Sequence, residues 1–113
     1  MHELALSQSV VELVADHAAR ERLRKVTRVV LEIGAAAAVE PEALCFCFDL
    51  VAADTIVQGA ELAIEMVALR ARCQRCGCEF SPAALYDCCP DCGGLERTWL
   101  AGREMRVKSF DGE

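Results

Sequence analysis

Two short cysteine motifs constrain this chain more than any other feature of its sequence. They are Cys73-Gln74-Arg75-Cys76-Gly77 and Cys89-Pro90-Asp91-Cys92-Gly93, and twelve residues separate Cys76 from Cys89. A tight turn between cysteines three positions apart brings both thiolates to one point, and two such turns complete the four-sulfur tetrahedron that suits zinc. A zinc held by four thiolates has no open coordination position, so we expect it to stabilise a small module rather than to catalyse a reaction. The spacing therefore predicts one structural zinc bound by Cys73, Cys76, Cys89 and Cys92.

The remaining four of the eight cysteines have no assigned role. Cys78 and Cys88 flank the two motifs. Cys88 directly precedes Cys89, so these two cysteines could compete for the same coordination position of the metal. We favour Cys89 because only Cys89 has the motif spacing. Cys45 and Cys47 lie about 200° apart around a predicted helix, so they cannot chelate one ion together, and we expect them to pack as small apolar residues. The chain opens without a secretory signal, which favours reduced thiols and a cytoplasmic protein over a disulfide-bonded secreted domain.

The charge is distributed unevenly along the 113 residues, whose net charge is -6. Residues 1–69 contain five Lys/Arg and eleven Asp/Glu, whereas 70–97 have four of each and hold six of the cysteines. We therefore expect an acidic α/β domain at 1–69, a zinc-binding domain at 70–97, and a last strand at 98–113 that returns to the first domain. The negative charge argues against binding to a phosphate backbone, and no apolar run is long enough to span a membrane.

Hydrophobic periodicity predicts the secondary structure. Residues 4–19 place Leu6, Val10, Leu13, Val14 and Ala18 near one helical face, with Ser7 elsewhere. Residues 25–33 alternate as a half-buried strand closed by Gly34, and Pro41 begins a second helix whose buried face carries Leu44, Phe48 and Val51. Residues 61–69 and 103–110 alternate again as strands. This order predicts an α+β fold: a small three-stranded mixed sheet with two helices, plus an inserted four-cysteine lobe that resembles a zinc ribbon.

The first three residues, Met1-His2-Glu3, suggest a second metal site. A free α-amine, the following amides and an imidazole can supply four planar nitrogens, an arrangement that suits Ni(II) or Cu(II). Taken alone, the triplet is weak. Together with the amphipathic first helix, the strand ending in Gly34, the segment Glu40-Pro41-Glu42-Ala43-Leu44 and the two cysteine motifs, it resembles the HypA/HybF family of nickel metallochaperones for [NiFe]-hydrogenase maturation. The likeness extends over essentially the whole chain.

The resemblance implies a nickel-binding lobe and a zinc lobe. Nickel would be bound by the Met1 amine, by the His2 imidazole and backbone, and by the Glu3 backbone or carboxylate; zinc would be bound by Cys73, Cys76, Cys89 and Cys92. The implied partners are a GTPase nickel chaperone and the hydrogenase large-subunit precursor, with neither nucleic acid nor a membrane among them, and with a monomer or a weak dimer as the oligomeric state. Some relatives carry histidines beside the cysteine motifs, proposed to make zinc respond to pH or nickel; here Gly77, Cys78 and Gly93 occupy those positions.

Two other functions compete with metal delivery. A zinc-ribbon module that binds nucleic acid is favoured by the basic cluster of Arg70, Arg72 and Arg75, but only Phe80 and Tyr86 are present in the module for base stacking. A redox enzyme with a CxxC dithiol is disfavoured because zinc would occupy both thiol pairs. His17, the only other histidine, is expected on the surface. We therefore interpret the chain as a non-enzyme that delivers nickel.

Overall fold

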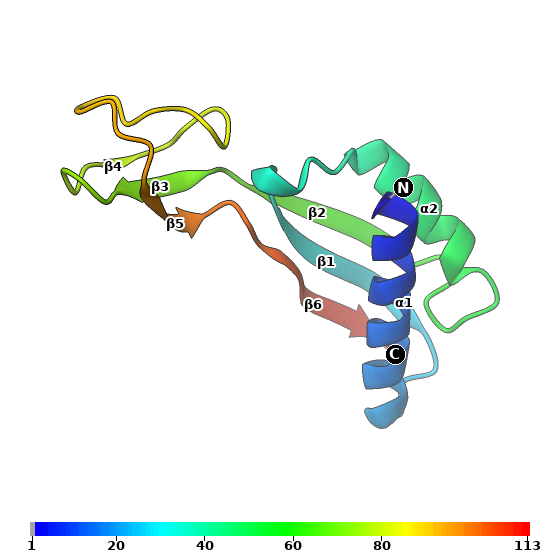
Figure 1. The fold of residues 1–113 in the computed structure, drawn as a ribbon. Coiled ribbons are helices and arrows are strands. Elements are labelled where there is room, and N and C mark those ends of the chain that lie inside the picture. Colours follow the sequence, from blue (N-terminus) through cyan, green and yellow to red (C-terminus); the bar gives the residue numbers. More distant parts are fainter. Residues whose placement is uncertain (1) are drawn as a thin grey trace. The chain divides into compact units, whose positions relative to one another are not determined.

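A computed structural model describes residues 2–113. Its elements, in chain order, are α1 (His2–Arg20), β1 (Val26–Gly34), the 3-10 helix η1 (Ala35–Ala37), α2 (Pro41–Ala52), β2 (Glu61–Val67), β3 (Arg70–Cys73), β4 (Glu79–Phe80), β5 (Arg97–Ala101) and β6 (Met105–Gly112) (Figure 1). They form two compact units, one of residues 2–31, 39–65 and 106–113, the other of 32–38 and 66–105. The expected α+β class is confirmed.

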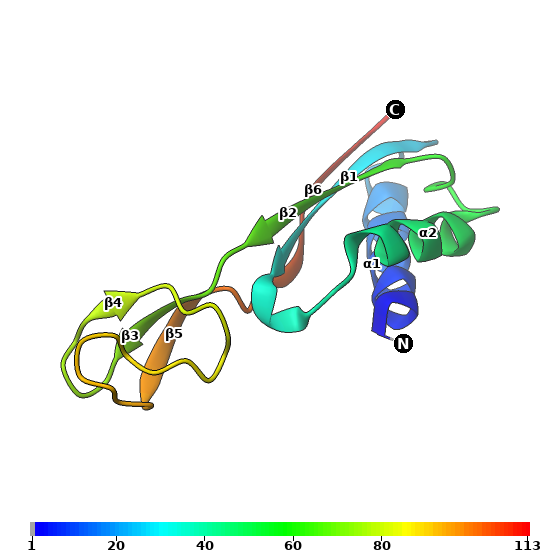
Figure 2. The ribbon, with the colours of Figure 1, turned by 90° about the horizontal axis from the view of Figure 1, so that it is seen from above.

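The first sheet has three strands in the order β2-β1-β6, so β1 is central. β1 and β2 run in the same direction and β6 runs in the opposite one, which confirms the mixed sheet (Figure 2). Val29, Leu31 and Ile33 of β1 are buried, as the alternation predicts. Thr27, which the same alternation would bury, is exposed, and its hydroxyl donates to the Asp111 carbonyl of β6 at 3.2 Å.

The buried face of α1 differs from the expected one at Leu13 and Ser7, and it also includes Val11. Leu13 is 46% exposed, whereas Ser7 is fully buried. The Ser7 hydroxyl donates to the Glu3 carbonyl at 2.8 Å and lies 3.4 Å from the Leu44 carbonyl of α2. A small side chain with two carbonyl acceptors lets the two helix backbones approach each other closely, and periodicity alone does not reveal such a contact.

Helix α2 begins as its sequence predicts. Pro41 occupies the first turn, and the N-cap Glu40 accepts a hydrogen bond from the Glu42 amide at 3.3 Å. Leu44 and Phe48 are buried, and Val51 is half-buried. Cys47 is buried and Cys45 is half-buried; burial raises the pKa of the Cys45 thiol. These two cysteines therefore pack as small apolar residues, as expected.

The second unit has its own antiparallel sheet in the order β4-β3-β5. Strand β5 was not among the elements expected from the sequence, because its burial alternates only between half-buried and exposed. Its Arg97 guanidinium lies 5.6 Å from the Phe80 ring centroid and 5.5 Å from that of Trp99, which covers the small core with a cation–π stack. That core consists of Ala71, Cys73, Phe80 and Cys89.

Gly34 and Gly102 allow two backbone segments of the second unit to touch. The Gly34 amide donates to the Glu104 carbonyl at 2.7 Å, and the Ala36 amide donates to the Gly102 carbonyl at 2.9 Å. A Cβ on Gly34 would overlap the Gly102 carbonyl, and Gly102 has a φ of 102°. Only glycine fits both positions, so the Gly34 that ends the predicted strand also has a packing role.

Candidate metal centres

The two cysteine motifs fold as nearly identical turns. The Gly77 amide donates to the Cys73 carbonyl and the Gly93 amide to the Cys89 carbonyl, both at 2.9 Å. Each glycine has a positive φ, 78° and 74° respectively, which an L side chain rarely adopts. Each turn is closed by a second bond at 2.9 Å, from Cys73 N to the Cys78 carbonyl and from Cys89 N to the Gly94 carbonyl.

The two turns bring four sulfurs to one point. The ligand atoms of Cys73, Cys76, Cys89 and Cys92 all lie within 4.8 Å of one another. Cys73 Sγ is 3.5 Å from Cys92 Sγ, and Cys76 Sγ is 3.6 Å from Cys89 Sγ. A zinc–sulfur bond of about 2.3 Å in a tetrahedron requires sulfurs roughly 3.8 Å apart. The geometry therefore fits a tetrahedral metal ion bound by these four cysteines.

The electrostatics of this cluster favour bound cations. The Cys76 amide N–H stabilises the Cys73 thiolate and lowers its pKa to about 6, and the Cys92 amide lowers the pKa of Cys89 in the same way. The Cys78 amide also stabilises the Cys76 thiolate, but desolvation and the neighbouring sulfurs outweigh it and raise the pKa of Cys76 to about 12. Adjacent thiolates repel each other, so a divalent cation is what allows all four to be deprotonated together.

Acid should release a metal from this cluster. A lowered thiol pKa means that the Cys73 thiolate is present above that pKa and is lost as the pH falls through it. Protons compete with a bound metal for all four thiolates, so we expect one metal per chain at pH 7 and a progressive loss as the pH falls. A chromophoric chelator added at stepped pH values measures this release. A metal content that stays unchanged down to about pH 2 would contradict ligation by thiolates.

The other two cysteines of this unit lie outside the four-sulfur cluster. Cys88 is exposed, and Cys78 is half-buried with its thiol 3.6 Å from the Glu79 carbonyl. Among residues 2–113, the only group of three or more metal-ligating side chains is that of Cys73, Cys76, Cys89 and Cys92. The preference for Cys89 over Cys88 therefore agrees with the geometry, while the ligand assignment itself stays a prediction.

The expected nickel triplet lies partly within the described structure. Met1 lies outside the described residues, whereas His2 and Glu3 form the first turn of α1. His2 Nε2 is 3.7 Å from Glu3 Oε2, and the His2 side chain is 54% exposed. The first four N–H groups of a helix have no carbonyl partner within it, so the amides of both residues belong to the unpaired end of α1.

Glu3 is held in place by a contact that the sequence does not reveal. Its Oε2 accepts a hydrogen bond from the backbone amide of Glu40 at 3.2 Å, and its side chain is only 16% exposed. This amide holds the pKa of the Glu3 carboxyl below its usual value. The carboxylate therefore joins the start of α1 to the N-cap of α2, and no spacing rule links residues 37 positions apart.

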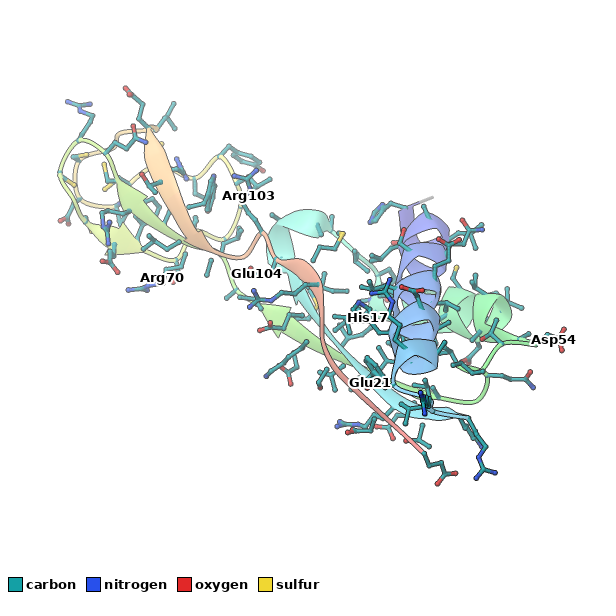
Figure 3. The ribbon with its side chains drawn as sticks, turned by 90° about the horizontal axis from the view of Figure 1, so that it is seen from below. His17, Glu21, Asp54, Arg70, Arg103 and Glu104 are labelled. Carbon is teal, nitrogen blue, oxygen red and sulfur yellow. The ribbon has the colours of Figure 1, made fainter. Side chains whose placement is uncertain are left out.

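The basic cluster that favours nucleic-acid binding is partly occupied by ion pairs, because two of its arginines share one carboxylate. Arg70 and Arg72 both pair with Glu79, each at 3.1 Å, and Figure 3 places Arg70 on the sheet of the second unit. Phe80 is buried in the core and stacked against Arg97, so it offers no face to a base. Of the two aromatic residues considered for stacking, only Tyr86 is exposed.

Together these features define a small metal-binding protein with a closed four-thiolate centre in one unit and a histidine–glutamate pair at the first helix of the other. Within residues 2–113, no helix is both long and apolar enough to cross a membrane. Residues 1–112 match the family model described as hydrogenase/urease nickel incorporation, metallochaperone, hypA. The chain belongs to this family of nickel-incorporation metallochaperones.

Similar proteins extend over the same length. The hydrogenase maturation factor HypA of Geotalea uraniireducens is 45% identical over 113 residues, which cover 100% of both chains. That of Psychromonas ingrahamii is 40% identical over 113 residues, covering 100% of this chain and 99% of the relative. The solution structure of the Ni metallochaperone HypA from Helicobacter pylori superposes with a TM-score of 0.70 at 27% identity, covering 97% of this chain and 96% of that one. A further HypA solution structure has a TM-score of 0.74 at 29% identity and covers 100% of this chain and 97% of that one.

Proposed function

We propose that this chain binds Ni(II) at Met1, His2 and Glu3 and delivers it during maturation of [NiFe]-hydrogenase. The family supports nickel incorporation as the general role. The donors would be the Met1 amine, the backbone nitrogens of the next residues and the His2 imidazole, which together suit a square-planar ion.

One observation carries the nickel proposal. His2 and Glu3 open α1, where backbone N–H groups have no intrahelical partner, so metal binding to these nitrogens breaks no helical hydrogen bond. The His2 side chain is exposed, and an exposed site allows nickel to be passed on. Glu3 would contribute its backbone, because its carboxylate is already bound by the Glu40 amide.

The four-thiolate centre has a different role in this proposal. Cys73, Cys76, Cys89 and Cys92 would bind one structural zinc, because four thiolates in a tetrahedron suit zinc and leave no open coordination position. Residues 1–69 would then form the nickel-binding domain, 70–97 the zinc-binding domain, and 98–113 the return to the first domain. The compact units differ from this division, because β5 pairs with β3 and residues 98–105 belong to the second unit.

A protein that delivers nickel needs a partner that exchanges the metal with it and a partner that receives the metal. We propose that a GTPase nickel chaperone exchanges nickel with this chain and that the hydrogenase large-subunit precursor receives it, in the cytoplasm and without chemical turnover by the chain itself. Neither nucleic acid nor a membrane is needed for this role. The ion pairs of Arg70 and Arg72 with Glu79 support the delivery role over the nucleic-acid alternative.

A nickel titration of matched histidine variants tests the proposal. His2→Ala should reduce nickel affinity at least about 100-fold, because it removes the only imidazole of the site. His17→Ala is the control, since His17 is the only other histidine and lies near the opposite end of α1 (Figure 3). It should leave affinity unchanged. Equal affinities for His2→Ala and the wild type, measured by calorimetry, would refute the site.

A further inference from the structure

The solvent-facing side of α2 carries two large apolar side chains that the fold leaves uncovered. Phe46 is 66% exposed and Leu50 is 60% exposed. They are four positions apart on the helix, so they are neighbours on one face, and Glu42 extends the same row by one turn. Asp49 lies beside them, three positions after Phe46. We call Glu42, Phe46, Asp49 and Leu50 the outer face of α2.

The segment of the chain that carries the outer face is acidic. Residues 29–69 include seven Asp/Glu but no Lys, Arg or His. Glu61 pairs with Arg28 at 3.3 Å and Glu65 with Lys108 at 2.9 Å. Within the described chain, the carboxylates nearest the outer face form no ion pair; these are Glu42, Asp49 and Asp54. Figure 3 shows Asp54 directed outward just after the end of α2.

The exposed apolar side chains and the unpaired carboxylates together indicate which kind of partner binds the outer face. Exposed apolar residues within a polar border are typical of protein–protein contacts, and complementary charge steers the partner. A second copy of the same face would place like charges opposite each other, and nucleic acids and anionic lipids would be repelled in the same way. A partner protein with an apolar socket bordered by Lys or Arg would complement both the apolar residues and the acidic residues of the outer face.

The outer face is also joined to the residues of the proposed nickel site. The N-cap residue of α2, Glu40, donates its amide to Glu3 at 3.2 Å. One turn further along, the Leu44 carbonyl contacts Ser7 of α1. A partner on α2 would therefore contact the helix that packs directly against α1, whose first turn carries His2 and Glu3, and metal transfer requires such proximity.

We propose that the outer face of α2 docks the nickel-exchanging GTPase, through an apolar socket bordered by basic residues on the GTPase. The inference rests on the proposed function, because the GTPase is the partner named there. It predicts that docking and nickel binding use different residues: Phe46 and Leu50 contact the partner, whereas His2 binds the metal.

Calorimetry with the full chain and the purified GTPase tests the docking surface. The double variant Phe46→Ser/Leu50→Ser should bind at least about tenfold more weakly, as expected for central apolar contacts. The control is Leu85→Ser/Tyr86→Ser, which removes an equally exposed apolar pair from the other unit and should bind as the wild type does. Glu42→Lys/Asp49→Lys should also weaken binding, whereas Glu12→Lys on α1 should not. Wild-type affinity should fall as salt rises from about 0.05 M to about 0.3 M.

Nickel titrations of the same variants separate this proposal from the function on which it rests. All of them should bind nickel as the wild type does, because none of them replaces a residue of the proposed nickel site. A Phe46→Ser/Leu50→Ser chain that binds the GTPase as tightly as the wild type would overturn the docking surface, and so would a wild-type chain that fails to bind the GTPase. A wild-type chain that binds the GTPase through α2 but does not bind nickel would refute the nickel site and leave the docking surface supported.

Discussion

Cys76→Ser and Cys92→Ser should each lose nearly all of the bound zinc, and the second unit should lose its order while the first unit stays folded. The reason is the size of the core: its buried residues are Ala71, Cys73, Phe80 and Cys89, and two of them are proposed ligands. Such a module depends on its metal for folding. The wild type should contain one zinc per chain by elemental analysis. Amide exchange should show protection lost in β3 and β5 and kept in β1.

Cys88→Ser is the matched control, because Cys88 is exposed and lies outside the four-sulfur cluster. This variant should keep one zinc and the protection of β3. Full zinc retention in both Cys76→Ser and Cys92→Ser would mean that the ligands are misassigned, with Cys78 or Cys88 as the substitutes.

A chain with three residues added before Met1 should lose most of its nickel affinity. The extension converts the Met1 amine into a peptide nitrogen and so removes one donor from the proposed chelate. It leaves the cysteines and the core unaltered, so zinc content and circular dichroism should not change. The same three residues added after Glu113 are the control. An N-terminally extended chain that binds nickel as tightly as the wild type would place the nickel among the cysteines instead.

The Glu3 substitution and the pH dependence of nickel binding test which atoms bind the nickel. Glu3→Ala should weaken nickel binding less than His2→Ala does, because the Glu3 carboxylate is bound to the Glu40 amide and the backbone nitrogen survives substitution. Nickel affinity of the wild type should also fall in acid, since protons compete with nickel for the amine and the imidazole. Loss of affinity in Glu3→Ala equal to that in His2→Ala would indicate carboxylate ligation.

Much of the local structure could be predicted because short-range rules govern it. Pro41 marks the start of α2, and the alternation of Val29, Leu31 and Ile33 marks a strand with a buried face. The cysteine motifs are equally local, since three-residue spacing and a following glycine define each turn. Their convergence was predictable from the number of ligands that one metal requires.

The errors in the sequence prediction occurred where distant segments meet. Ser7 was placed away from the buried face, and Leu13 on it, because periodicity does not record that α2 covers one part of α1 and leaves another open. Strand β5 was missed because half-buried residues alternate too weakly, and its pairing with β3 defines it instead. In each case the deciding contact joins residues far apart in the chain.

The sequence by itself therefore determined the fold class, the two cysteine turns and the kinship with nickel metallochaperones, because these depend on local spacing and residue chemistry. Only the tertiary structure decided how Glu3 is held, which arginines form ion pairs and which apolar residues of α2 remain exposed. The physical reason is that a hydrogen bond, an ion pair or a buried surface requires two partners in space. Chain order does not specify these partners. It does not place the Glu40 amide beside Glu3 or the Glu79 carboxylate beside Arg70 and Arg72, and it does not show which face of α2 stays uncovered.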